Sequence, residues 1–384
     1  MLTSILKLLL AFTMAVSQIF APVGALISNG GEKAFFENWS SESEYTASYA
    51  QEIEKQPGKD FVILNITDVQ LEDYEVYGKN GELAEKTIDK LVNDVKPDLI
   101  TMTGDNGWGT MAYLELIKQI DSYGIPWAPI MGNHDGQGLM SEFWAAYNFS
   151  KAENCLFRFG PSDMGYGTYV INITENGHGI HTIFMMDTQS SAVFETEDGK
   201  ESGYDHLWAN QLEWYKWVID GVAKQEGRTV ESSVFFHIPV CEYQDAWDAA
   251  VIKAEEDDTA ETADTPEIKD GPYNDEYKDV SFGKNGEDVC CSPVNNGFFA
   301  LCQSLGSTKN IVSGHDHVNN ASILYEGIRL TYGMKTGAGC YWDKNMNGGT
   351  KFTVSSDGSM ATEHIYVDPA DVGYKTSSSI SDIC

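Results

Sequence analysis

The chain has 384 residues, 42% of them hydrophobic, which is enough to bury a packed core and argues against wholesale disorder. Its formal net charge of −33 argues against a surface that binds the nucleic-acid backbone, because such binding sets Lys and Arg against phosphates. A small phosphorylated substrate would be repelled as well, unless a bound metal ion supplied local positive charge.

Residues 1–25 have the pattern of a signal peptide, with Lys7 before an apolar run at 8–16 and small residues up to Ala25. The alternative is a buried helix of the mature fold. No later stretch is long and apolar enough to span a bilayer, and the tail at 371–384 is polar, which argues against a lipid anchor. We therefore expect a soluble, exported protein, secreted or periplasmic, that begins with a polar leader at 26–58.

The leader is followed by alternating strands and helices. Short apolar runs rich in β-formers predict strands at 61–67, 98–103 and 125–131, and helical spacing of apolar residues predicts helices at 82–95 and 111–123. This βαβαβ order predicts a parallel sheet covered by helices. We expect one domain over residues 59–370.

The second half of the chain continues this domain. Its predicted strands lie at 168–173, 182–186, 233–240 and 308–313, its helices at 207–222 and 297–305, and a hairpin turns around 356–358. The acidic stretch at 254–288 reads as a solvated insertion loop, with a lid over a cleft as the alternative. The seven cysteines are an odd number; export permits disulfides, but the sequence does not give the pairing.

Polar residues cluster at the carboxyl ends of five predicted strands. Four groups lie just past a strand, and His237 lies late in its strand. Open α/β sheets bind ligands at this edge. Each has an ordinary explanation when taken singly, such as a helix cap, a turn or a core histidine. Together, carboxylate, amide oxygen and imidazole suit Mn, Fe, Zn or Mg. The residues concerned are Asp68, Gln70, Asp105, Asn106, Asn133, His134, Asp135, His237, His315, Asp316 and His317.

The ordered motifs Asp-Val-Gln at 68–70, Gly-Asp-Asn at 104–106, Gly-Asn-His-Asp at 132–135 and Gly-His-Asp-His at 314–317, with His237 before the last of them, resemble the calcineurin-like metallophosphoesterase superfamily. Their flanks resemble its purple-acid-phosphatase-related branch. The resemblance covers about residues 60–340. It implies an α/β (α+β) fold, a four-layer αββα sandwich of two mixed sheets flanked by helices.

The resemblance also implies a ligand set for two divalent metal ions. One ion takes Asp68, Gln70, the bridging Asp105 and His317; the other takes Asp105, Asn133, His237 and His315. Two such ions can hold a hydroxide and clamp a phosphoryl group during in-line attack.

The same resemblance gives supporting roles to His134 and Asp135, and the motifs contain two further polar residues. His134 would face the substrate, stabilise the developing charge and help protonate the leaving oxygen, while Asp135 would orient His134. Asn106 would bind substrate or hold the turn. Asp316 is expected to brace the loop that carries the two neighbouring histidines.

Two positions depart from the family pattern. The first motif of the family is usually Asp-x-His, whereas Gln70 stands here; an amide oxygen is a harder donor than imidazole and shifts preference from Zn toward Mn or Mg. True purple enzymes carry a tyrosine ligand where this chain has Trp108, so a purple iron(III) centre is not expected.

We therefore expect a secreted dimetal phosphoesterase that acts on phosphomonoesters. Two alternatives stay open. One is a phosphodiesterase acting on nucleotides or lipid headgroups, which the scarcity of arginines favours; the other is a non-catalytic binding protein with a degenerate metal site, which Gln70 favours.

Overall fold

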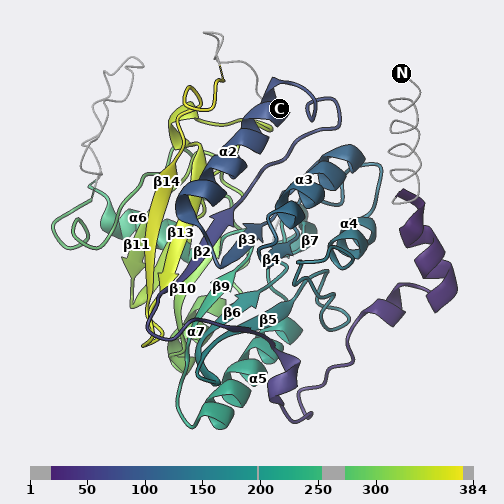
Figure 1. Ribbon diagram of the computed structural model, residues 1–384. Helices are drawn as coiled ribbons and strands as arrows, with labels where there is room; N and C mark the ends of the chain where they lie inside the picture. Colours follow the sequence, from purple (N-terminus) through teal and green to yellow (C-terminus); the bar gives the residue numbers. More distant parts are fainter. Residues whose placement is uncertain (1–18, 197–198, 253–272, 375–384) are drawn as a thin grey trace.

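The computed structural model describes residues 19–196, 199–252 and 273–374, and it places them in two packed β-sheets with helices on the outer faces (Figure 1). A five-stranded sheet has the order β14-β13-β2-β3-β4, and a seven-stranded sheet has the order β1-β5-β6-β9-β10-β12-β11. A separate hairpin is formed by β7 (Ser191–Thr196) and β8 (Gly199–Tyr204).

The five-stranded sheet is built around the βαβαβ unit. Strands β2, β3 and β4 are parallel, and the C-terminal hairpin of β13 and β14 adds antiparallel to β2. The elements are β2 (Phe61–Ile66), α2 (Lys79–Val95), β3 (Leu99–Thr103), α3 (Thr110–Ser122), β4 (Trp127–Ile130), α4 (Glu142–Phe149), β13 (Gly348–Val354) and β14 (Met360–Tyr366).

The seven-stranded sheet mixes both strand directions. Neighbours β6, β9, β10 and β12 are parallel, β5 is antiparallel to β6, and β11 is antiparallel to β12. The elements are β1 (Gln51–Glu54), β5 (Tyr169–Glu175), β6 (His178–Met185), α5 (Ala209–Glu226), β9 (Glu231–Phe235), α6 (Glu242–Ala250), α7 (Phe298–Leu305), β10 (Thr308–Ser313), β11 (Ser322–Tyr325) and β12 (Ile328–Tyr332). Three short 3₁₀ turns lie at Glu32–Phe35, Ala47–Tyr49 and Lys344–Met346.

The core lies between the two sheets. The rings of Phe235 on β9 and Phe352 on β13 meet edge to face at 5.5 Å, and the hydroxyl of Tyr169 on β5 donates to the carbonyl of Pro129 on β4 at 2.7 Å. Helix α2 packs on β2 and β13, whereas α5 and α7 pack on β6 and β10 of the other sheet. Figure 1 shows α2, α3 and α4 on one side and α5 and α7 on the opposite side. This is the expected four-layer αββα sandwich.

The predicted strands and helices of the βαβαβ unit are confirmed, as are the helices at 209–226 and 298–305 and the C-terminal hairpin. Among the boundaries that differ, one concerns the site: β9 ends at Phe235, so His237 lies in the loop after the strand and not within it. The leader contains a short strand, β1, which pairs in parallel with β5. Tyr273, which falls in the predicted solvated insertion, is buried.

Several predictions fall on residues outside the described ranges. These are most of the signal peptide, residues 253–272 of the acidic insertion and the tail from 375 onward. Across the described part of the chain, none of the helices combines the length and apolar character that a bilayer span requires.

Candidate metal centre

The predicted ligands meet at the edge where strands of both sheets end. Asp68 and Gln70 follow β2, Asp105 follows β3 and Asn133 follows β4, all from the five-stranded sheet. The loop after β9 carries His237, and the loop after β10 carries His315 and His317, from the seven-stranded sheet. All seven side chains are buried, with exposures of 7% or less, so their polar atoms require partners inside the protein.

The loops that carry these ligands turn unusually sharply. Asp68, Gln70, Asp105 and His315 have φ values of 54°, 47°, 48° and 80°, in the left-handed region that residues other than glycine rarely adopt. Such residues cost on the order of 1–3 kcal/mol each and cluster at functional sites. Gly104, at φ 89°, has no room for a side chain, because a Cβ atom would lie 2.7 Å from Nδ1 of His237.

Two groups of potential ligands share one carboxylate. Asp105, His237 and His315 form one group, and Asp68, Asp105 and His317 form the other; within each group the ligand atoms lie within 4.8 Å of one another. Asp105 belongs to both. A carboxylate has two oxygens, so Asp105 is suited to bridge two ions held by the two groups.

Backbone carbonyls fix the orientation of two imidazoles. Nδ1 of His237 donates to the carbonyl of Thr103 at 2.8 Å, and Nδ1 of His317 donates to the carbonyl of Tyr341 at 2.9 Å. Each ring therefore presents Nε2 to the centre, an arrangement common in metal-binding histidines. Nε2 of His237 lies 2.9 Å from Oδ1 of Asn133 and 3.3 Å from Oδ2 of Asp105.

Asp68 is held by neighbours from three segments. Its Oδ2 accepts from the Thr67 hydroxyl at 2.7 Å and from the His315 backbone N–H at 3.1 Å, and Nε2 of His317 lies 3.6 Å from Oδ1. The buried ammonium of Lys335 donates to the Asp68 carbonyl at 2.6 Å. Lys335 thus places a positive charge behind the carboxylates, although burial lowers its pKa.

The charges of the centre are strongly coupled. Burial opposes protonation of His237, but Asp105 and Asp68 beside it outweigh burial and raise its pKa to about 10. Burial has the opposite effect on a carboxylate, and it raises the pKa of Asp68. Burial also acts to raise the pKa of Asp105, but His237 outweighs it and holds that pKa well below its usual range. An ion that takes Nε2 of His237 must displace that proton, so metal uptake should release protons.

Gln70 contacts the shared carboxylate directly. Its Nε2 donates to Oδ2 of Asp105 at 2.7 Å, while its Oε1 is buried and has no hydrogen-bond partner. Nε2 of His315 is also buried without a partner. An unpartnered buried oxygen and an unpartnered imidazole nitrogen beside two carboxylates match the donor set of divalent ions. The residues present therefore fit a dinuclear centre.

His134 lies at the edge of the centre and is partly exposed. Its backbone N–H donates to Oδ1 of Asp105 at 2.9 Å, and its ring lies 4.4 Å from the ring of Trp108. Nδ1 of His134 lies 2.7 Å from Oε1 of Gln137, whose Nε2 donates to the Asn133 carbonyl at 3.2 Å. The amide oxygen of Gln137 can only accept, which assigns the hydrogen to Nδ1.

Asp135 does not orient His134 as we expected. It is buried, and its carboxylate accepts from the backbone N–H of Asn106 at 2.8 Å, from that of Gly132 at 2.6 Å and from the Tyr113 hydroxyl. Burial, with the nearby Asp105 charge, raises the pKa of Asp135 to about 7. The residue ties the loops after β3 and β4 together, and Gln137 orients the imidazole.

Asn106 holds the turn. Its Nδ2 donates to the Ile130 carbonyl at 2.8 Å and to Oδ2 of Asp135 at 3.0 Å, so both amide hydrogens are used within the protein, while its Oδ1 is buried without a hydrogen-bond partner. A contact of Asn106 with substrate stays a prediction. Asp316 braces its loop as expected, accepting from the Tyr332 hydroxyl at 2.6 Å and from the Cys290 backbone N–H at 3.3 Å.

Sequence reasoning missed three residues of the site. Gln137, Lys335 and Tyr204 lie outside the motifs, and the Tyr204 ring meets the edge of His315 at 4.4 Å from the β7–β8 hairpin. Gln137 had a usable signal, because a side-chain amide three residues after His134 can reach back to it within one turn. The other two reach the site through long-range packing that the sequence does not signal.

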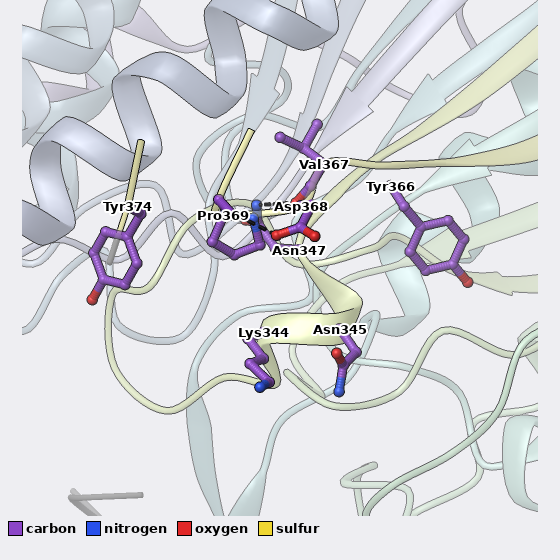
Figure 2. Close-up of a pocket in the computed structure, with 9 residues that line it drawn as sticks. Lys344, Asn345, Asn347, Tyr366, Val367, Asp368, Pro369 and Tyr374 are labelled. Carbon is purple, nitrogen blue, oxygen red and sulfur yellow. Dashed lines mark hydrogen bonds between the residues drawn. The ribbon is translucent and has the colours of Figure 1, made fainter. Parts of the chain in front are cut away.

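A cavity of about 420 Å³ lies beside the C-terminal hairpin and contains none of the candidate ligands; Figure 2 shows the residues that line it. It is lined by Lys344, Asn345, Asn347, Tyr366, Val367, Asp368, Pro369, Ala370 and Tyr374. The Asn347 side chain is already committed to Gly337, Thr87 and Val367, and none of the nine residues belongs to either ligand group. We therefore do not connect this cavity with the chemistry of the centre.

Comparison with known proteins identifies the family of the chain. The profile of the calcineurin-like phosphoesterase family matches residues 61–319, which include every candidate ligand. The chain belongs to this family of metallophosphoesterases, which bind a dinuclear metal centre.

The chain is similar to "Probable inactive purple acid phosphatase 14" of Arabidopsis thaliana, with 27% identity over 272 residues that cover 64% of this chain and 60% of the relative. It is also similar to "Phosphatase DCR2" of Saccharomyces cerevisiae, with 26% identity over 220 residues that cover 50% and 37%. The chain thus spans about three fifths of the length of the first relative. The crystal structure of a dimetal phosphatase from Danio rerio covers 80% of this chain and 96% of its own, at 11% identity and a TM-score of 0.48.

Proposed function

We propose that this protein hydrolyses phosphate esters at a centre of two divalent metal ions, with phosphomonoesters as the first substrate class to test. The observation that supports this most directly is the pair of ligand groups that share Asp105. The side chains that meet here would hold two ions. The first ion would be held by Asp68, Gln70, Asp105 and His317. The second would be held by Asp105, Asn133, His237 and His315. Bound ions would supply the positive charge that attracts a phosphate and a nucleophile derived from water.

The residues of the chain account for the proton that the leaving group needs. Gln137 Oε1 fixes the hydrogen of His134 on Nδ1, so Nε2 of the neutral ring has a free lone pair. When that nitrogen is protonated, it can donate to the leaving oxygen of a bound ester. The Trp108 ring restricts rotation of the imidazole and shields one side of it. His134 is therefore the proposed general acid, and Gln137 and Trp108 are positioning residues.

A phosphodiesterase is the second candidate, and the arginines support it. A phosphomonoester carries one more negative charge than a diester and gains from additional donors. The guanidinium groups of Arg158, Arg228 and Arg329 instead donate to the Tyr49 carbonyl, the Gly179 carbonyl and the Ser322 hydroxyl, none of which belongs to the centre.

A non-catalytic protein with a metal site is the third candidate. The contact between Gln70 and Asp105 supports it, because a carboxylate oxygen that accepts from an amide is a weaker ligand. The word "inactive" in the names of the Arabidopsis relatives is said of those proteins, and it makes the same question worth asking here.

One set of measurements on a single preparation separates these candidates. Purified protein is loaded with Mn, Fe, Zn or Mg, its metal content is determined by elemental analysis, and turnover of p-nitrophenyl phosphate and bis-p-nitrophenyl phosphate is measured. We expect two ions per chain and turnover that falls about 10²–10⁴-fold in His134→Ala, the usual contribution of a general acid, with metal content unchanged. Two bound ions without turnover of either ester under any loading would refute the enzyme and favour the binding protein.

We also propose that the chain is exported. The basic residue, the apolar run and the small residues at 1–25 support this. Expression of the full chain in a secreting host, followed by mass spectrometry of the mature N-terminus, should show cleavage after Ala25. An intact N-terminus on protein retained inside the cell would contradict the proposal.

A further inference from the structure

Two thiols from separate loops face each other. Cys241 comes four residues after His237 and directly precedes α6, and Cys291 lies in the loop that leads to α7. Their sulfur atoms are 3.4 Å apart, although the residues are 50 positions apart in the sequence. We propose that Cys241 and Cys291 form a disulfide that ties the loop after β9 to the loop before α7.

The neighbouring cysteines do not compete for this bond. Cys290 is adjacent to Cys291, but its thiol approaches the carbonyl of Asp288 at 3.6 Å, and burial together with Asp316 raises its pKa to about 12. Cys302 is fully buried in α7, and burial raises its pKa to about 12 as well. Cys155 is partly buried, and burial raises the pKa of its thiol well above the usual value.

The contacts also assign the order of the reaction. Cys291 donates its thiol hydrogen to the sulfur of Cys241, and this hydrogen bond lowers the pKa of Cys241 although burial opposes it. The pKa of Cys291 is raised, first by the same hydrogen bond and then by burial. Since the thiolate is the nucleophile in disulfide exchange, Cys241 reacts first.

The oxidant belongs to the class of low-molecular-weight disulfides, such as glutathione disulfide. The Cys241 thiolate attacks one sulfur of this reagent, which forms a mixed disulfide and releases one glutathione thiolate. Cys291 then loses its proton and attacks the Cys241 sulfur, which releases the second glutathione. Two protein thiols are oxidised and one glutathione disulfide is reduced to two glutathione molecules.

The bond would reinforce a contact that already exists between the same two segments. Nδ2 of Asn295 donates to Oε1 of Glu242 at 2.8 Å, and this contact would remain. The weak hydrogen bond that the Cys241 thiol donates to the Ser292 carbonyl at 3.3 Å would be replaced by the covalent link. One segment continues from His237, and the other contacts the Asp316 loop through Cys290. Because the link would close a loop of 50 positions, it restricts the unfolded chain strongly and should raise the melting temperature on the order of 5 °C.

Peptide mapping of the full-length protein tests the assignment. The purified chain is incubated with glutathione disulfide, remaining thiols are alkylated, and the digest is analysed by mass spectrometry without reduction. We expect one linked peptide that joins Cys241 to Cys291 and disappears after dithiothreitol. A link between Cys241 and Cys290, or alkylation of both Cys241 and Cys291 after oxidation, would overturn the proposal.

Matched variants add a second readout. Cys290→Ser removes the adjacent thiol and should keep the linked peptide and the rise in melting temperature on oxidation. Cys291→Ser should lose both. Should Cys291→Ser fail to fold, the wild-type map still decides the question, since it requires no substitution. An equal rise in melting temperature on oxidation in Cys291→Ser would show that another bond is responsible.

Discussion

The two sheets contribute chemically different ligands to the centre. The five-stranded sheet supplies the oxygen donors Asp68, Asp105 and Asn133 together with Gln70, whereas the seven-stranded sheet supplies the imidazoles of His237, His315 and His317. The oxygen donors sit within one βαβαβ unit that folds from neighbouring residues. The imidazoles come from distant parts of the chain. The centre is therefore complete only when the two sheets pack together.

The largest expected effect comes from Asp105, the residue that belongs to both ligand groups. Asp105→Asn removes the charge that attracts both ions, so we expect metal content below one ion per chain and a loss of turnover on the order of 10³-fold, about 4 kcal/mol of barrier. Elemental analysis and p-nitrophenyl phosphate turnover check this. Retention of two ions would show that Asp105 does not bridge.

A smaller effect is expected for His317, which serves one group only. His317→Ala should reduce metal content from two ions to one, because Asp105, His237 and His315 remain in place. We expect turnover to fall about 100-fold, less than for Asp105→Asn. Elemental analysis measures the metal content of this variant as well. An equal loss of metal in His317→Ala and Asp105→Asn would mean that the two ligand groups bind metal only as a unit.

Substitution of Gln70 would add an imidazole to the ligands that the five-stranded sheet supplies. Gln70→His removes the amide that donates to Asp105 and provides a softer ligand, so we expect relative affinity to move toward Zn over Mn and Mg by a few-fold to about tenfold. Competition titrations with the metal-free protein measure this. Gln70→Ala is the control, since it also removes the donor but adds no ligand.

The last prediction concerns stability and not activity, and it contrasts a buried carboxylate outside the centre with the carboxylates of the centre. Burial, reinforced by Glu142, raises the pKa of Asp187 from 3.8 to about 8. The folded protein keeps this proton while the unfolded chain loses it, so Asp187 lowers stability progressively as pH rises from about 4 to about 8. Asp187→Asn should remove that slope.

Urea unfolding at about pH 5 and about pH 8 measures the difference. The variant also replaces one of the two oxygens that accept from the backbone N–H groups of Tyr166 and Gln189 with an NH2 group, which costs about 1–3 kcal/mol independently of pH. We therefore compare slopes and not absolute stabilities. A wild-type protein that loses no more stability than the variant between the two pH values would contradict the assignment.

The sequence was most informative where local pattern and burial coincide. β2, α2, β3, α3 and β4 were predicted because both sheet faces are buried and the helices are amphipathic. By contrast, β1 is four residues long and mostly polar, and β7 and β8 are largely exposed, so their periodicity is weak. They are strands because of their partners, which local sequence does not reveal.

The same distinction holds within the site. The motifs predicted which side chains gather, and the structure brings all seven candidate ligands together. They did not predict which neighbours hold them. Asp135 follows His134 in sequence, but the turn directs the Asp135 carboxylate to backbone N–H groups. A buried carboxylate requires hydrogen-bond donors, and these N–H groups supply them in place of the His134 ring.

The location of the ligands on two sheets couples ion binding to folding. Any ion that binds the folded chain and not the unfolded one adds RT ln(1 + [M]/Kd) to the free energy of unfolding. Since each ligand group draws on both sheets, neither sheet separated from the other would bind the ions as tightly. Bound ions would therefore hold the two sheets together, and the melting temperature of the whole domain would rise with the concentration of free metal ion.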